Sequence, residues 1–155
     1  MRYSWLLLIP ATLSVAATRT DFLPYKMGVP LSCALLLLAA AGKDVRRQRV
    51  VFPVVFAFGS SAVGDYFLSN KLDSETYFVL GIGAFFIAHL GYLSYSIKVG
   101  QLHWKALWLL LLAYLAYFVL YLYPAIDDRV LSASVLVYLL ISCVVLSAAL
   151  GMRTV

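Results

Sequence analysis

The sequence predicts an all-α protein, a polytopic transmembrane helical bundle of about six spans. Composition is the first reason, because 64% of the 155 residues are hydrophobic, only 12% are charged and the mean hydropathy is +0.94. Soluble domains carry about a quarter of their residues as charged ones. Pattern is the second reason, since the apolar blocks are long and lack the alternation of membrane β-strands. Short loops leave room for one domain, residues 1–155.

Apolar blocks separated by charged and turn-forming residues give the expected helices. They are Ser4–Ala17, Gly28–Gly42, Val50–Leu68, Tyr77–Ile97, Trp104–Tyr123 and Arg129–Leu150. The first block is short, and with Arg2 before it and small residues at its end it also resembles a cleavable signal peptide. We expect it to be retained as a span, because residues 18–26 lead directly into the next apolar block.

The basic residues indicate how the helices are oriented. Lys43, Arg46, Arg47 and Arg49 lie together between the second and third blocks, and short basic loops stay on the cytoplasmic side. Both termini are then cytoplasmic, and we expect an integral protein of the bacterial inner (plasma) membrane. The net charge of +5 reflects this orientation. Because the basic residues form no stripe with interleaved aromatics, no nucleic-acid partner is expected.

An aspartate inside the third block, Asp65, is the first candidate for a functional residue. An ionised side chain near a membrane core costs roughly 2.5–3.5 kcal/mol on insertion scales, so acidic residues there usually face protein or water. Small residues precede it, and Ser60 and Gly64 have the four-residue spacing that lets another helix approach closely. Asp65 is therefore expected to point into the bundle.

The depth of each residue along its helix suggests partners for Asp65. At a rise of about 1.5 Å per residue, Asp65 lies roughly 7 Å below the outer end of its helix. Lys26 enters the second helix from the same side, so an ion pair between the two is predicted, either functional or merely fixing helix packing. His89 lies roughly 18 Å from the outer end of its helix, which favours a bridged contact. His89 and Tyr92 share one small-and-polar helical face that could line a cavity.

The last block carries a second polar helical face. Ser134, Tyr138 and Ser142 recur every four residues, and hydroxyls in membrane helices usually bond to backbone or hold helices together. Tyr138 is the best candidate among them for a site residue, because a phenol can orient water or a phosphate ester. Cys33 and Cys143 are interpreted as small core residues without a disulfide. No zinc site is expected, since no second pair of ligands accompanies the two cysteines, and no cofactor is expected either.

Two stretches together resemble a known family. Ser60-Ser-Ala-Val-Gly-Asp65-Tyr-Phe-Leu68, followed by Phe78-Val-Leu-Gly81-Ile-Gly-Ala-Phe85-Phe-Ile-Ala-His89-Leu-Gly-Tyr92, resembles the YhhN family of membrane proteins, the lysoplasmalogenases. Tyr25-Lys26 is similar to the family's earlier Lys-Pro element, although Met27 stands where proline is expected. The segment from Tyr138 to Ala148 is similar to a later family helix.

The resemblance implies cleavage of the vinyl-ether bond of lysoplasmalogens, which releases a fatty aldehyde and a glycerophospho-base. The chemistry needs a carboxylic acid and a water-orienting partner, without a cofactor. Asp65 would act as acid/base or stabilise the cation, and His89 and Tyr92 would position water. The residues expected to bind the lysophospholipid substrate are Lys26, which would hold the phosphate or tune Asp65, together with Ser61 and Tyr138.

The resemblance also implies two further helices with a second Ser-Asp element beyond Val155. The chain would then correspond to the N-terminal portion of a longer eight-helix fold, or to a shortened variant of it. Oligomeric state and head-group preference stay open at this point.

Two other functions compete with hydrolysis. In a small transporter or lipid-binding membrane protein, Asp65 and His89 would serve a polar path. Inverted repeats would favour a transporter, and no convincing pair of matching halves is visible. In a structural bundle, Asp65 would only pair with Lys26, and a packed core beside it would favour that interpretation.

Overall fold

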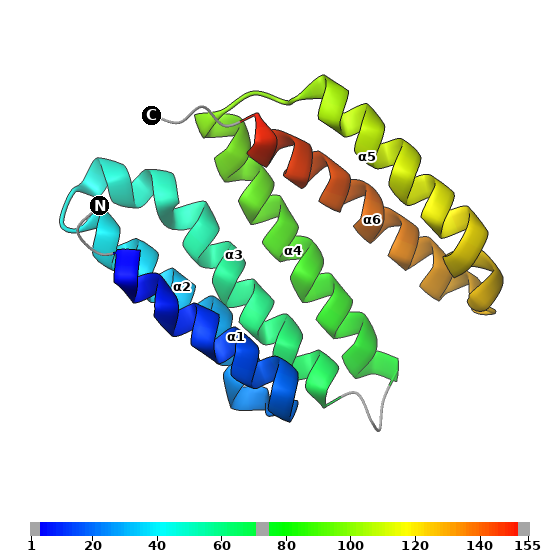
Figure 1. Cartoon of the computed structure of the whole chain (residues 1–155), viewed down its shortest axis with the longest axis horizontal. Helices are drawn as coiled ribbons and strands as arrows, with labels where there is room; N and C mark the ends of the chain where they lie inside the picture. Colours follow the sequence, from blue (N-terminus) through cyan, green and yellow to red (C-terminus); the bar gives the residue numbers. More distant parts are fainter. Residues whose placement is uncertain (1–3, 71–74, 152–155) are drawn as a thin grey trace. The chain divides into compact units, whose positions relative to one another are not determined.

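The computed structural model describes residues 4–70 and 75–151, and these fold into six α-helices with short 3-10 and π segments (Figure 1). The all-α prediction is confirmed. In chain order the elements are η1 Ser4–Leu7, α1 Leu8–Thr20, α2 Leu23–Ala41, α3 Val45–Ser69, α4 Glu75–Val99, α5 Trp104–Tyr117, η3 Phe118–Leu122, η4 Tyr123–Ala125 and α6 Arg129–Leu150.

Helix length and apolarity identify an integral membrane protein. Five helical segments of the described chain are long and apolar enough to cross a bilayer, namely Leu23–Ala41, Val45–Ser69, Thr76–Val99, Trp104–Ala125 and Arg129–Leu150. The first apolar helix, Trp5–Thr20, is shorter than the roughly 20 residues that a span needs. The expected sixth span is therefore not among the long candidates. Large apolar side chains such as Leu109 and Leu112 are 69% and 72% exposed, as lipid-facing positions are.

Helix starts differ most from prediction where a cap or proline acts. Helix α2 begins at Leu23 rather than at Gly28, because Pro24 sits in its first turn, where a missing N–H costs nothing. Helix α3 begins at Val45 rather than at Val50, because the Asp44 side chain caps it. Arg46, Arg47 and Arg49 therefore lie on the first turns of α3, while Lys43 lies in the turn before it.

Helix α5 is interrupted near its predicted end. Its α-helical part stops at Tyr117, a π-helix follows over Phe118–Leu122, and a 3-10 turn contains Pro124. Proline supplies no backbone N–H and clashes with the carbonyl one turn earlier, so a regular α-helix cannot continue through Pro124 unchanged. Helix α6 has the predicted bounds, and Asp128 caps it by accepting a hydrogen bond from Val130 N–H at 2.7 Å.

The chain divides into two compact units, Met1–Tyr92 and Leu93–Val155, with the boundary inside α4. In the first unit α2 packs against both α1 and α3 (Figure 1). In the second unit α5 packs against α6 around an apolar core of Leu107, Phe118, Leu139 and Cys143. One domain over residues 1–155 stays a prediction.

Candidate functional site

Glycines bring α3 and the first part of α4 into close contact. A Cβ atom on Gly64 would lie 2.7 Å from the Phe85 ring, and one on Gly91 would lie 2.6 Å from the Pro53 carbonyl oxygen. Neither position has room for a side chain. The close approach expected from the small residues around Asp65 is thus found at Gly64, and it positions the polar side chains of the two helices opposite one another.

A pair of hydroxyl groups joins the two helices. The Ser61 Oγ and the Tyr92 Oη are 3.3 Å apart, and either can donate the hydrogen bond. The Tyr92 ring is held edge-to-face against Phe58 on α3, with ring centroids 5.6 Å apart. Two predicted site residues from separate sequence stretches therefore meet, and Tyr92 is oriented by both a hydrogen bond and ring packing.

His89 lies one turn before Tyr92 on α4, with ring centroids 6.2 Å apart. Its Nδ1 is 2.8 Å from the Phe85 carbonyl oxygen. Because a carbonyl only accepts, Nδ1 must carry the hydrogen in this bond. In the neutral ring the lone pair is then on Nε2, which is the nitrogen able to accept a proton.

Asp65 is half-buried and lies four residues after Ser61, on the same face of α3. Across residues 4–70 and 75–151, no hydrogen bond or ion pair to its carboxyl group is found. The carboxyl is also near the C-terminal end of α3, just before its last turn, and the negative end of the helix dipole does not stabilise a negative charge. This carboxyl group therefore has no evident structural duty within the described chain.

The direct ion pair predicted between Lys26 and Asp65 is wrong. The Lys26 ammonium pairs instead with Asp21, which lies just before α2. Asp21 ends α1 in the left-handed conformation with φ 52°, a conformation that aspartate tolerates, and this turn brings its carboxylate to Lys26. The hydrogen bond and the charge of Lys26 together lower the pKa of Asp21.

Lys26 still acts on Asp65 through space. Its charge is the one that attracts the Asp65 carboxyl group electrostatically, although the two groups are not paired. Its side chain is 29% exposed. Lys26 is thus placed to influence the site while a second carboxylate neutralises it.

Tyr138 lies on α6 in the second unit. On α6 the Ser142 hydroxyl donates to the Tyr138 carbonyl oxygen at 2.8 Å, and the Ser134 hydroxyl donates to the Val130 carbonyl oxygen at 2.8 Å. The serines bond to backbone, as predicted for hydroxyls in a membrane helix. A role of Tyr138 in substrate binding stays a prediction.

The sequence did not predict an apolar groove that lies between α3 and the first part of α4. It has a volume of about 430 Å³ and is lined by Phe56, Gly59, Ser60, Val63, Ala84 and Ile87. Gly59 contributes open space, since a Cβ there would meet nothing within 4 Å. The paired small residues of α3 were the available signal, although they were interpreted only as a helix contact.

No group of three or more His, Cys, Asp or Glu side chains that could hold a metal ion is found in the described ranges. Cys33 and Cys143 are free thiols. The candidate groups of the site are a carboxyl, an imidazole, two hydroxyls and an ammonium.

Comparison with known proteins identifies the family. The YhhN family matches residues 26–154, which include all of the candidate residues named above. No curated protein and no solved structure matches the chain. With most of its length matched and long apolar helices throughout that length, the chain belongs to the YhhN family of membrane proteins.

Proposed function

We propose that the protein hydrolyses the vinyl-ether bond of lysoplasmalogens, with Asp65 as the central group. The observation that carries the proposal is the placement of Asp65, half-buried in a membrane span and without a hydrogen bond or ion pair in the described chain. A carboxyl group in such a place is costly unless it has a task. The YhhN family, which includes lysoplasmalogenases, supplies a matching reaction.

The reaction needs one proton and one water molecule. A proton is added to the outer alkene carbon of the vinyl ether, which leaves an oxocarbenium ion at the carbon bonded to oxygen. Water attacks that carbon and loses a proton, giving a hemiacetal. The hemiacetal then breaks its bond to the glycerol oxygen, which takes up a proton and leaves as the alcohol, while a fatty aldehyde is released.

Asp65 provides the carboxyl group for the first of these steps. As an acid it transfers the proton to the alkene, and as a carboxylate it stabilises the oxocarbenium ion that follows. Both roles gain from a site with little water, where electrostatic interactions are stronger. A solvent-exposed carboxylate would do neither well.

Tyr92 and His89 orient the attacking water. The Tyr92 hydroxyl is hydrogen-bonded to the Ser61 hydroxyl at 3.3 Å, so it is preorganised for binding the water molecule. The Nδ1–H of His89 donates to the Phe85 carbonyl oxygen, so Nε2 is the basic nitrogen of the neutral ring and would be the one to accept a proton from water. Tyr92 and His89 lie on α4 and Ser61 lies on α3, and the two helices are in close contact at their glycines.

The substrate's two ends are bound by different features. The apolar groove between α3 and α4 accepts part of the hydrocarbon chain, since its lining is almost entirely apolar. Lys26 binds the phosphate, in exchange for its pairing with Asp21. Both features belong to the first compact unit, as do Asp65, His89 and Tyr92.

The test is aldehyde release from a purified preparation of the full chain. A lysoplasmalogen and the ordinary 1-acyl lysophospholipid with the same head group are compared side by side. Aldehyde from the first and no fatty acid from the second are expected. Absence of aldehyde from folded protein, or equal cleavage of both lipids, contradicts the proposal.

A further inference from the structure

A second cavity lies at the other end of α3, where the end of α2 meets its start. It has a volume of about 350 Å³ and an almost wholly apolar lining. Two arginines complete its wall. The cavity is lined by Leu37, Ala40, Val50 and Val51, together with Arg46 and Arg47.

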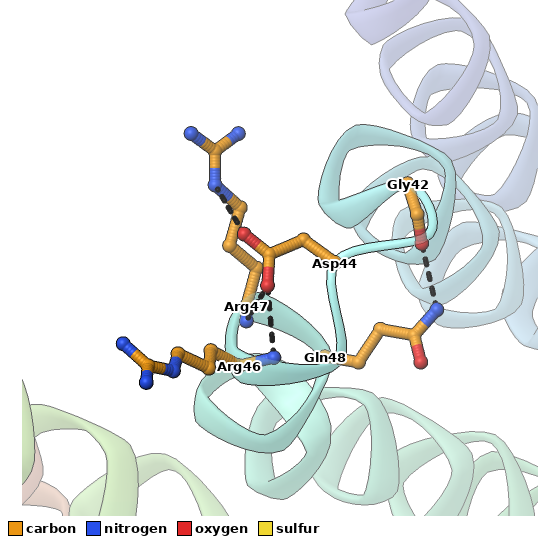
Figure 2. Close-up of polar contacts among 5 residues, drawn as sticks. All are labelled: Gly42, Asp44, Arg46, Arg47 and Gln48. Atoms are coloured by element: carbon orange, nitrogen blue, oxygen red, sulfur yellow. Dashed lines mark hydrogen bonds and ion pairs between the residues drawn. The ribbon is translucent and has the colours of Figure 1, made fainter.

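Four hydrogen bonds hold the turn beside this cavity. Gly42 has φ 61°, in the region that favours glycine, and its N–H donates to the Leu38 carbonyl oxygen at 3.1 Å. The Gln48 side-chain amide donates to the Gly42 carbonyl oxygen at 2.6 Å (Figure 2). Asp44 Oδ1 accepts from the N–H groups of Arg46 at 2.9 Å and Arg47 at 3.4 Å. The backbone that carries both arginines is thus fixed.

The charges of this turn are mostly uncompensated. Asp44 is the acid of the segment, and its Oδ2 lies 3.5 Å from Arg47 Nε, which leaves the outer nitrogens of that guanidinium for other acceptors. The Arg46 guanidinium points away from Asp44 (Figure 2) and has no ion pair within the described chain. Lys43 and Arg49 add further positive charge nearby.

We infer that this cavity binds an anionic phospholipid of the cytoplasmic leaflet. Its phosphodiester would bind the guanidinium groups of Arg46 and Arg47, which suit phosphate oxygens. One acyl chain would lie along the apolar wall formed by Leu37, Ala40 and Val50. The positive-inside rule places this end of α3 at the cytoplasmic surface, where anionic lipids attract basic segments.

The apolar lining favours a lipid over a free phosphate ion. A free anion would use only the two guanidinium groups and gain nothing from the remaining wall. This site is also separate from the proposed catalytic one, because Arg46 and Asp65 are about 28 Å apart along α3 at about 1.5 Å per residue. Its failure would therefore leave the proposed hydrolysis untouched.

The experiment measures lipid selectivity of the full chain in phosphatidylcholine nanodiscs. Spin-labelled phosphatidylglycerol and spin-labelled phosphatidylcholine are compared by the fraction that the protein immobilises. The wild type is expected to prefer phosphatidylglycerol several-fold. Arg46→Gln and Arg47→Gln should each lower that preference about threefold to fivefold, and both side chains are exposed, so the fold is not disturbed.

Two further variants separate the cavity from general surface charge. Arg49→Gln removes the same charge from the same helix without touching the cavity lining, and should change the preference less than twofold. Ala40→Phe fills the cavity and keeps every charge, and should lower the preference as much as Arg46→Gln. Equal losses in Arg49→Gln and Arg46→Gln, no loss in Ala40→Phe, or displacement by millimolar inorganic phosphate would each overturn the inference.

Discussion

Asp44 and Asp65 are two aspartates associated with one helix, α3, and they have opposite surroundings. Asp44 precedes the helix, is exposed, caps two N–H groups and lies near a guanidinium. Asp65 lies near the C-terminal end of the helix, is half-buried, and has no such partner in the described chain. The helix dipole favours the first charge and not the second. The carboxyl group of Asp44 thus serves folding at one end of α3, and that of Asp65, near the other end, is the one that we propose for chemistry.

Exchanging each carboxyl for an amide tests this contrast with the largest expected effect. Asp65→Asn should lower aldehyde release about 10²–10⁴-fold, the usual contribution of a positioned acid or base. Asp44→Asn should leave turnover within a fewfold, because asparagine caps helices nearly as well. Both rates are measured on lysoplasmalogen with protein of equal helical content. Unchanged turnover in Asp65→Asn removes that residue from the mechanism.

The glycine contact behind the site gives the next largest effect, on stability. Gly91→Ala places a Cβ 2.6 Å from the Pro53 carbonyl oxygen, a backbone atom that cannot move aside as a flexible side chain would. The substitution should lower the free energy of unfolding by about 1–3 kcal/mol. Gly83→Ala, on the same helix, meets nothing within 4 Å and should be neutral or stabilising. Thermal unfolding in detergent distinguishes the two. Equal melting temperatures would mean that α3 and α4 do not pack so closely.

The hydroxyl pair predicts a smaller effect. Tyr92→Phe removes the hydrogen bond to Ser61 and should lower turnover about threefold to tenfold, the range expected for one hydrogen bond. Tyr66→Phe, at an exposed position next to Asp65, is the matched control and should leave turnover unchanged. A loss in both variants would point to a general effect of phenol removal on the bundle.

The sequence was informative where one residue acts locally and uninformative where two helices must be in register. The bounds of α6 were predictable because Asp128 caps its start and Gly151 follows its end. Lys26 was assigned the wrong partner because its true one, Asp21, depends on a left-handed turn that no apolar pattern reveals.

The contact between Ser61 and Tyr92 shows the same limit within the site. Both residues were candidates, yet their pairing depends on how far α3 slides along α4. The glycine contacts that set this register involve the backbone and side chains of a distant segment. Local spacing cannot predict such a contact, and the apolar groove was missed for the same reason.

The pair of Asp21 and Lys26 gives the smallest expected effect. Pairing lowers the pKa of Asp21, so its contribution to stability is present at neutral pH and is lost as the pH falls through its folded-state pKa. The exposed carboxylate keeps this contribution small. Carbon-detected NMR titration of Asp21 should show a midpoint below the ordinary aspartate value, returning toward it in Lys26→Met. An identical midpoint in both proteins would rule out the ion pair.

The proton transfer itself is tested most directly by isotope labelling of the aldehyde. The full chain is incubated with lysoplasmalogen in D₂O that is also enriched in ¹⁸O. The aldehyde is trapped by rapid reduction to the alcohol. Our account predicts that the trapped alcohol carries one solvent deuterium on the carbon next to the former carbonyl, and that its oxygen comes from the solvent. Asp65→Asn should form far less of this doubly labelled product. Aldehyde without solvent deuterium, or equal product from Asp65→Asn, would contradict it.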